Sequence, residues 1–284
     1  ALSIRDGGIT TPVTSQGHGF QRTLLIAALD ILARHGTAKA ETGTICLAIE
    51  EPELFQHPTQ AKAFASVLRS LATNPNDRVQ VMYATHSPYF VEPTYFDNVR
   101  RVVREATLGG PPAVRVMQAS MEVVADRLEH FDSRRSVVKR FEQICLKTLP
   151  EALFADAVII VEGDDDAAIL QGACQSPNQL AIQGVAVAVA GGKTNVLLPH
   201  AILKELGVKA LCVIDNDKGH SERMRRDTTK DATDIELAEL ETTTRNRSFC
   251  RYFGVAEEDY PEGVVSEEFV AMPDTLESTI SLDW

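Results

Sequence analysis

Short apolar runs alternate with helix-like periodicity along most of the chain. In the first hundred residues, TICLAI (44–49) and VQVMYAT (79–85) have the length and composition of buried strands. Apolar residues at helical spacing precede the first run, and Pro58 opens a second helical pattern over about 59–72, between the two runs. A strand, a crossover helix and another strand predict a parallel α/β sheet.

The same alternation returns in the second half of the chain. Three apolar runs there predict strands that end beside acidic residues or glycines, and two helical patterns lie between them. The strands are AVIIV (157–161), VAVAVA (185–190) and ALCVI (210–214), and the helices cover about 164–173 and 197–207. This order predicts a second open α/β sheet.

The segments outside these two patterns are less regular. ATLGGPP (106–112) is a turn-rich break, and we interpret the helical residues from about 120 to 150 as a connector. Residues 218–247 are highly charged, which predicts an exposed loop and helix. SFCRYF (248–253) has the aromatic content of a possible strand.

Composition narrows the class of protein. A chain of 284 residues that is 44% hydrophobic and 24% charged is globular and long enough for two domains. A net charge of −12 means that nucleic acid would be bound through local basic patches or bridging metal ions, and not through net charge. No apolar run approaches the length of a membrane span, and residues 1–15 do not resemble a signal peptide.

The five cysteines are widely spaced and include no CxxC pair. This pattern argues against a disulfide framework or a zinc site, and a reducing cytoplasm fits best. Cys46 and Cys212 lie inside apolar runs and are expected to be small core residues.

Carboxylates follow two of the predicted strands in the second half. Glu162 comes after 157–161, and Asp215 and Asp217 come after 210–214. Ligands bind beyond the carboxyl ends of parallel strands, and a spacing of two residues puts two side chains on one side of an extended chain. Asp166 can face the same pocket if a helix begins at Gly163. Such oxygen ligands suit Mg²⁺ or Mn²⁺, although solvated turn acids and helix N-caps are the alternative.

These residues resemble the Toprim domain, which occurs in topoisomerases, primases and overcoming-lysogenisation-defect (OLD) nucleases. The resemblance covers about 155–280 and rests on Glu162-Gly163, Asp215-x-Asp217 and, for the OLD form, Gly191-Gly192-Lys193-x-Asn195. It implies that Glu162, Asp166, Asp215 and Asp217 bind metal. Glu277, in Asp274-Thr275-Leu276-Glu277, would serve a second ion.

The resemblance also implies roles in catalysis. Glu162 would take part in proton transfer, and Lys193 would contact a phosphate unless it is a solvated loop lysine. Two ions held in this way can stabilise the attacking and leaving oxygens of a phosphodiester displacement. OLD nucleases usually carry a further functional lysine beyond the last acidic element, and no lysine follows Glu277 up to Trp284.

The first half resembles ABC-type ATPases. TICLAIEEPELFQHP resembles a Walker B element in which Glu50 holds Mg²⁺ through water and Glu51 orients or deprotonates the attacking water, although Asp is usual at the first position. His86 resembles the switch histidine. SQGHGFQR resembles the signature loop, with Ser15, Gly17, Gly19 and Gln21 at the ATP site. Taken alone, each motif has an ordinary alternative. The signature-like loop also fits a common glycine turn, His86 fits a structural histidine, and the acidic run after 44–49 fits a solvated helix start.

A GxxxxGK[ST] phosphate loop is missing from the sequence. The resemblance places that loop ahead of residue 1, so ATPase activity is expected only with the missing region. ABC-type proteins complete the ATP site across a dimer, which implies a homodimer for the full-length protein.

Together, these motifs identify the chain as the C-terminal portion of an OLD-family protein of α/β class. The expected domains are part of an ABC-type ATPase over 1–105, a largely helical connector over 106–150 and a Rossmann-like Toprim domain over 151–284. The implied activity is metal-dependent DNA endonuclease with two Mg²⁺ or Mn²⁺ ions, coupled to an ATPase in the full-length protein.

Basic residues supply candidates for contacts to the DNA backbone. They are Arg134, Arg135, Lys139, Arg223, Arg225 and Arg226. Ordinary surface charge is the alternative for these residues. For the whole chain, the alternatives are an ATP-gated DNA-binding module with an inert Toprim site, another Toprim enzyme such as a primase or topoisomerase, and a phosphohydrolase of small phosphates.

Overall fold

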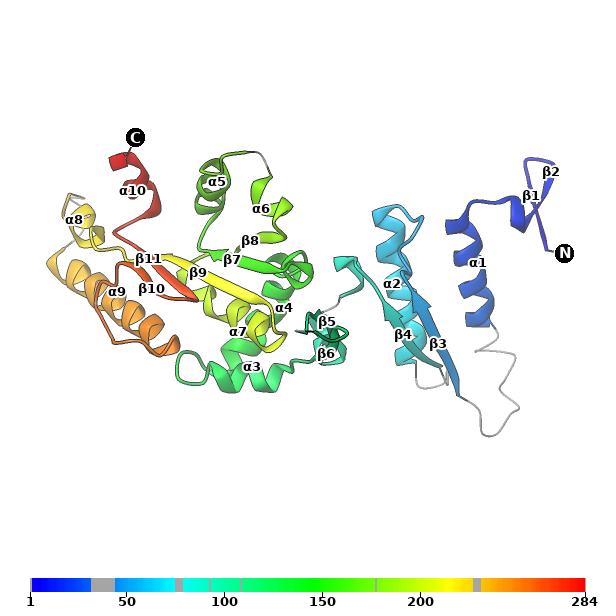
Figure 1. Ribbon diagram of the computed structural model, residues 1–284, viewed down its shortest axis with the longest axis horizontal. Coiled ribbons are helices and arrows are strands. Elements are labelled where there is room, and N and C mark those ends of the chain that lie inside the picture. Colours follow the sequence, from blue (N-terminus) through cyan, green and yellow to red (C-terminus); the bar gives the residue numbers. More distant parts are fainter. Residues whose placement is uncertain are drawn as a thin grey trace. The chain divides into compact units, whose positions relative to one another are not determined.

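The computed structural model describes residues 2–31, 44–74, 79–91, 93–107, 109–176, 178–226 and 231–283. The chain forms two compact units, Ala1–Val91 and Glu92–Trp284, which are described separately (Figure 1). Among the described residues, every helix is too short or too polar to cross a membrane.

The first unit contains the expected strand–helix–strand arrangement. Strands β3 and β4 pair in parallel from Ile45↔Val79 to Glu50↔Ala84, so both end at the same edge. Helix α2 begins with Pro58 after an N-cap at His57, which accepts a hydrogen bond from the backbone of Thr59. The elements of this unit are β1 (Ser3–Asp6), β2 (Ile9–Pro12), α1 (His18–Ile31), β3 (Ile45–Glu50), α2 (Pro58–Thr73) and β4 (Val79–Ala84).

The core of the first unit lies between α2 and one face of this two-stranded sheet. Phe64, Leu68 and Leu71 of α2 are buried against the inward side chains of β3 and β4. The strands alternate half-buried and exposed positions, so they are not buried on both faces as expected. Cys46 lies on the exposed face, and its expected place in the core is therefore wrong.

The second unit is built on a five-stranded sheet with the order β10-β11-β9-β7-β8. Strands β11, β9, β7 and β8 are parallel, and β10 is an antiparallel edge strand. Their bounds are β7 (Ala157–Val161), β8 (Val185–Val189), β9 (Lys209–Asp215), β10 (Gly263–Ser266) and β11 (Phe269–Met272). The three strands expected from apolar runs are present, and the α/β fold class is confirmed.

Helices cover both faces of this sheet (Figure 1). Val161 and Val213 pack with Ala167 of α5 on one face, whereas Cys212 and Ile214 are buried on the face that α7 covers. Cys212 is thus a core residue, as expected. The helices are α3 (Met121–Arg127), α4 (Arg134–Lys147), α5 (Asp164–Gly172), α6 (Gln179–Ile182), α7 (Leu197–Glu205), α8 (His220–Arg225), α9 (Ala232–Tyr252) and α10 (Leu276–Asp283).

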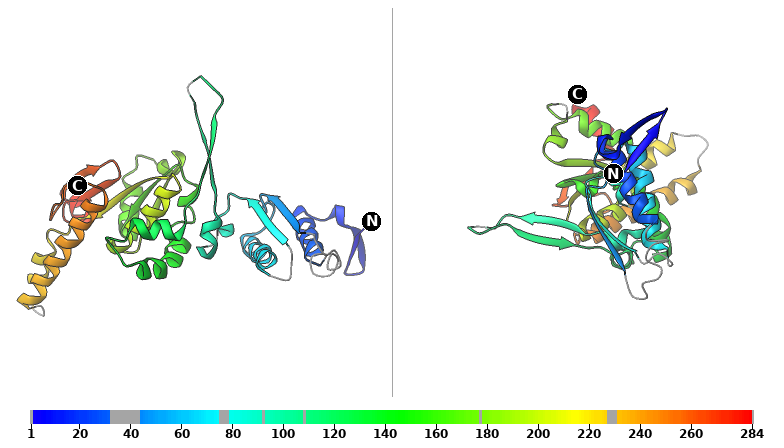
Figure 2. Two further views of the ribbon diagram at one scale, coloured as in Figure 1. Left: turned by 90° about the horizontal axis from the view of Figure 1, so that it is seen from below. Right: turned by 90° about the vertical axis from the view of Figure 1, so that its right-hand side faces the viewer.

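The segment expected to be a connector belongs to the second unit. Strands β5 (Arg101–Glu105) and β6 (Ala113–Met117) pair across the turn-rich break as an antiparallel hairpin, the long two-stranded ribbon in Figure 2. Helices α3 and α4 pack against α7. The two compact units divide between Val91 and Glu92. The expected boundary at 105 would separate β5 from its hairpin partner β6.

The expected strand at 248–253 is wrong. These residues are the last turns of α9, a helix of 21 residues. The buried residues of α9 lie four, three and one positions apart, which is the periodicity of one helix face. They are Thr242, Asn246, Phe249 and Cys250. Phe249 stacks on Phe269 of β11 with ring centroids 5.8 Å apart. Burial of one helix face therefore outweighs the strand preference of the aromatic residues.

Candidate functional site

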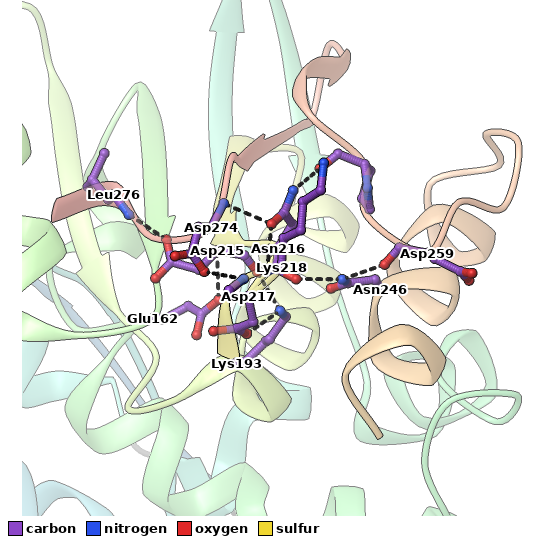
Figure 3. A network of polar contacts seen from close by, with 12 residues as sticks. Glu162, Lys193, Asp215, Asn216, Asp217, Lys218, Asn246, Asp259, Asp274 and Leu276 are labelled. Atoms are coloured by element: carbon purple, nitrogen blue, oxygen red, sulfur yellow. Dashed lines mark hydrogen bonds and ion pairs between the residues drawn. The ribbon is translucent and has the colours of Figure 1, made fainter. Parts of the chain in front are cut away.

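Two parallel strands of the second unit deliver carboxylates to one edge of the sheet. Glu162 follows β7 directly, and Asp215 is the last residue of β9. The two are joined, because Glu162 Oε1 accepts a hydrogen bond of 3.0 Å from the backbone N–H of Asp215 (Figure 3). The sheet thus places these acids where open α/β sheets bind ligands.

Two helix N-termini bring further acids to the same place. Asp166 lies in the first turn of α5, where its Oδ2 accepts a hydrogen bond of 2.9 Å from Gly163 N–H. Asp215 Oδ1 accepts one of 2.9 Å from Leu276 N–H at the start of α10, and Glu277 is the next residue. Oxygen atoms of Asp166, Asp215 and Glu277 lie within 4.8 Å of one another. We call these three residues the acidic cluster.

The protein environment favours protons on the carboxyl groups of Glu162, Asp166 and Asp215. Burial raises the pKa of Glu162 to about 7; nearby Lys193 lowers it, and the charges of Asp215 and Asp217 raise it. Burial, followed by the charge of Asp166, raises the pKa of Asp215 to about 7. The pKa of Asp166 is also raised, mainly by burial. A cation among these groups would remove the penalty of ionising them, and carboxylate oxygens suit Mg²⁺ or Mn²⁺.

Asp217 has a different partner from the acidic cluster. Its backbone is left-handed, with φ +55°, so the extended geometry expected for Asp215-x-Asp217 ends at β9. Lys193, which is 7% exposed, places its Nζ 2.8 Å from Asp217 Oδ2 and also donates to the carbonyl of Asp215. The lysine expected to contact a phosphate is therefore a buried counter-ion of Asp217 in this structure.

Three polar residues that were not among the candidate site residues support the site. Asn216 and Asn246 are 0% exposed, and both hydrogen-bond to backbone groups around the loop after β9. Asp274 accepts a hydrogen bond of 2.8 Å from Gly219 N–H and pairs with Arg223 at 2.5 Å. Asn216 stands inside a motif that was recognised for its acids alone, and Asn246 has no signal beyond its place on the buried helix face.

In the first unit, the ends of β3 and β4 bring two predicted ATP-site residues together. Glu51, with φ +44°, follows β3, and its Oε1 lies 3.2 Å from His86 Nε2. Glu53, which the sequence analysis did not select, accepts hydrogen bonds from Thr85 Oγ1 at 2.7 Å and His86 N–H at 3.0 Å. Glu50 is the exposed last residue of β3.

The predicted signature residues lie around the start of α1. Ser15 ends a 3₁₀ turn, Gly17 immediately precedes α1, and Gly19 and Gln21 are inside it. Gln21 Nε2 donates to the carbonyl of Gln16 at 2.7 Å. Gly19 packs so closely that a Cβ there would be 2.6 Å from the carbonyl oxygen of Phe55. The start of α1 is thus set against the turn that follows β3.

Two family models match the chain in the same order as these features. Residues 3–91 match an AAA ATPase domain, and residues 153–217 match the Toprim domain of proteins like the overcoming lysogenization defect protein. The second unit of the chain is therefore similar to OLD-type Toprim domains. The expected combination of an ATPase segment with an OLD-type Toprim domain is therefore confirmed.

Two curated relatives resemble this chain over most of its length. The "OLD nuclease" of Thermus scotoductus (strain ATCC 700910 / SA-01) is 28% identical over 221 residues, covering 76% of this chain and 38% of the relative. "Endonuclease GajA" of Bacillus cereus (strain HuB5-5) is 24% identical over 222 residues, covering 72% of this chain and 31% of the relative. The chain thus spans about a third of the length of these relatives.

The candidate DNA-contact residues fall into two groups. Arg134 forms ion pairs with Glu122 and Asp126, and Arg223 pairs with Asp274, so their charges are neutralised within the chain. The others are exposed and form no ion pair with a described residue. They are Arg135 and Lys139 on α4, and Arg225 and Arg226 at the end of α8.

Proposed function

We propose that this protein is a metal-dependent DNA endonuclease that hydrolyses phosphodiester bonds at its Toprim unit with two divalent ions. The observation that carries the proposal is the acidic cluster, in which three separate elements direct carboxylate oxygens to within 4.8 Å of one another. The names of the two relatives, nuclease and endonuclease, support the same reaction class.

The donor set fits Mg²⁺ or Mn²⁺. All of its ligand atoms are carboxylate oxygens, and the burial that raises the pKa of Asp215 would be offset by a bound cation. We propose that Asp166, Asp215 and Glu277 hold one ion and that Glu162 and Asp217 contribute to a second position. When bound, such ions supply positive charge to the attacking and leaving oxygens of the phosphodiester.

The remaining polar groups have roles that follow from their contacts. The pKa of Glu162 near 7 allows its carboxyl group to exchange a proton at neutral pH. Lys193 balances the charge of Asp217 and keeps that carboxylate at a fixed place beside Asp215. We propose that Lys193 reaches a phosphate of the substrate if Asp217 binds an ion in its place.

We further propose that the first unit acts as part of an ABC-type ATPase that is coupled to the Toprim domain of the second unit. Glu50, Glu51 and His86 would face ATP and its Mg²⁺ from the strand ends, and the ion-pair distance of 3.2 Å between Glu51 and His86 supports their joint action. Ser15, Gly17, Gly19 and Gln21 would meet the nucleotide of a second copy, which makes the proposed assembly a homodimer.

The test is cleavage of supercoiled plasmid with Mg²⁺, Mn²⁺ or EDTA. The wild-type protein is compared with the Asp215→Ala/Asp217→Ala double variant and with Asp165→Asn. Asp165 is an exposed acid in the same helical turn as Asp166, so its variant is a matched control for lost charge. Metal-dependent nicked or linear product from the wild type and Asp165→Asn, but not from the double variant, is expected.

The same assay separates the proposal from its main alternative. A folded wild-type protein that binds DNA but yields no product with either metal would contradict the endonuclease and favour an ATP-gated DNA-binding module. Release of phosphate from nucleotides without plasmid cleavage would instead favour a small-molecule phosphohydrolase.

A further inference from the structure

Asn216 stands between the two acids of the loop after β9, and its side chain is fully buried. Its exposed fraction is 0%, whereas Asp215 and Asp217 on either side are partly accessible. A buried amide is costly unless its donors and acceptors are satisfied. The direction of its hydrogen bonds therefore shows what the residue holds in place.

Each end of the Asn216 amide bonds to a backbone group from a distant segment, and its oxygen also bonds within the loop. Its Oδ1 accepts hydrogen bonds from Asp274 N–H at 2.8 Å and Lys218 N–H at 3.0 Å. Its Nδ2 donates to the carbonyl of Pro261 at 3.1 Å. One side chain thus ties the loop after β9 to the segment before β10 and to the segment that enters α10 (Figure 3).

The segment held through Asp274 is the one that supplies Glu277. The Asp217 N–H donates to the carbonyl of Asp274 at 3.0 Å, and two residues later Leu276 N–H donates to Asp215 Oδ1 at 2.9 Å. The start of α10 is therefore fixed to both acids of the loop. Because Glu277 follows Leu276, the position of its carboxylate relative to Asp215 depends on this attachment.

Asn246 of α9 holds the same loop from the other side. It is also 0% exposed, and its Nδ2 donates to the carbonyls of Asn216 and Asp259, both at 2.8 Å. Its Oδ1 is buried without a hydrogen-bond partner among the described residues. Asn246 therefore retains a polar side chain in the core chiefly for its two donated bonds.

We propose that Asn216 is a positioning residue that assembles the acidic cluster by locking the Asp274–Glu277 segment onto the end of β9, with Asn246 fixing Asn216 from α9. The inference rests on the proposed metal-dependent function. It adds a requirement for a hydrogen-bonding residue that contributes no ligand atom to the cluster. Partners of metal ligands typically alter metal affinity or activity about 10- to 100-fold when they are replaced.

The test compares Asn216→Leu and Asn216→Asp in the intact chain by Mn²⁺ titration followed by electron paramagnetic resonance. Leucine keeps the approximate volume and removes every polar bond, whereas aspartate keeps an acceptor for Asp274 N–H. We expect Asn216→Leu to weaken Mn²⁺ binding by about 10- to 100-fold and to lower plasmid cleavage in parallel. Asn216→Asp should lie closer to the wild type than Asn216→Leu does.

Stability is separated from positioning by a matched core variant. Ile202→Ala, in the fully buried part of α7, should lower the melting temperature without touching the cluster. Mn²⁺ should still raise the melting temperature of Ile202→Ala as it does that of the wild type, and should raise that of Asn216→Leu much less. Asn246→Leu should show the same selective loss, and it serves as the test variant if Asn216→Leu does not fold.

The outcomes distinguish the two proposals. Asn216 variants that lose stability yet bind Mn²⁺ like Ile202→Ala would overturn the positioning role. Wild-type protein that binds Mn²⁺ without cleaving DNA would overturn the endonuclease alone, and selective weakening in Asn216→Leu would still support the positioning role. Wild-type protein that binds no Mn²⁺ would overturn both.

Discussion

At the scale of single residues, Glu162 and Asp215 are the carboxyl groups whose protonation the fold changes most clearly. Burial raises their pKa from ordinary values of 4.5 and 3.8 to about 7 in both cases. A folded-state pKa above the unfolded value contributes stability that is complete below pH 4. That stability is lost as the pH rises through 7. Above that pH, the two charges are held together at a cost that a divalent cation would relieve.

This reasoning gives a prediction about pH and stability. In EDTA, the free energy of unfolding of the wild type should fall by up to about 5 kcal/mol, about half from each group, as the pH rises from about 5 to 8. The Glu162→Gln/Asp215→Asn double variant should lose much less over the same range, because neither replacement can ionise. Chemical denaturation at each pH measures both slopes, and Mn²⁺ should stabilise the wild type more at the upper pH than at the lower.

Asp165→Asn is the control for this experiment, because it removes one exposed acid from the same region. Its slope should match that of the wild type. Equal slopes for the wild type and the double variant would show that other groups set the pH dependence.

Some residues of the site are readable from sequence and others are not. Asp166, Asp215 and Glu277 belong to short motifs at predicted element ends, and the fold brings all three together. The pairing of Asp217 with Lys193 depends on a left-handed backbone after β9, which the two-residue spacing does not reveal. Asn246 acts through bonds to Asn216 and Asp259, and a single sequence does not say which buried amide meets which carbonyl.

At the scale of elements, continuous apolar runs predict strands well, because a strand that is buried on both faces is apolar at successive positions. Strands β7, β8 and β9 are of this kind. Strands β10 and β11 have four residues each, and the β5–β6 hairpin exposes Val102 and Val114, so neither pair has a strong pattern. The helical end of α9 was readable in principle from the spacing of its buried residues, but its aromatic content favoured a strand.

The contact between α1 and the turn after β3 gives a prediction at this scale. Gly19→Ala would place a methyl group 2.6 Å from the backbone oxygen of Phe55, which cannot rotate away. We expect an overpacking cost of about 1–3 kcal/mol, larger than the roughly 1 kcal/mol that alanine gains over glycine inside a helix. Differential scanning calorimetry should therefore show a lower melting temperature for the first unit.

Gly17→Ala is the matched control, because a Cβ at Gly17 would meet nothing within 4 Å. Replacing glycine by alanine at this helix start should cost at most about 1 kcal/mol, because alanine is the poorer residue before a helix. A Gly19→Ala protein as stable as Gly17→Ala would mean that α1 does not pack against the Phe55 turn.

At the scale of the whole molecule, a net charge of −12 opposes binding to DNA unless positive charge is concentrated locally. Several arginines are already neutralised: Arg134 pairs with Glu122 and Asp126, and Arg247 pairs with Asp259. A basic cluster in the sequence therefore overstates the charge available to a partner.

Arg135 and Lys139 are exposed on α4 four residues apart and form no ion pair with any described residue. If DNA follows this helix, the Arg135→Ala/Lys139→Ala double variant should weaken duplex binding uniformly across sequences. Each lost phosphate contact should also reduce the slope of log affinity against log salt by about 1.

Arg134→Ala, on the same helix, should leave the slope nearly unchanged because its charge is already paired. Fluorescence anisotropy across a salt series, with Ca²⁺ as the divalent ion, measures all three proteins. An unchanged slope in the double variant would mean that DNA does not contact these residues of α4. Arg225 and Arg226 at the end of α8 would then be the next pair to replace.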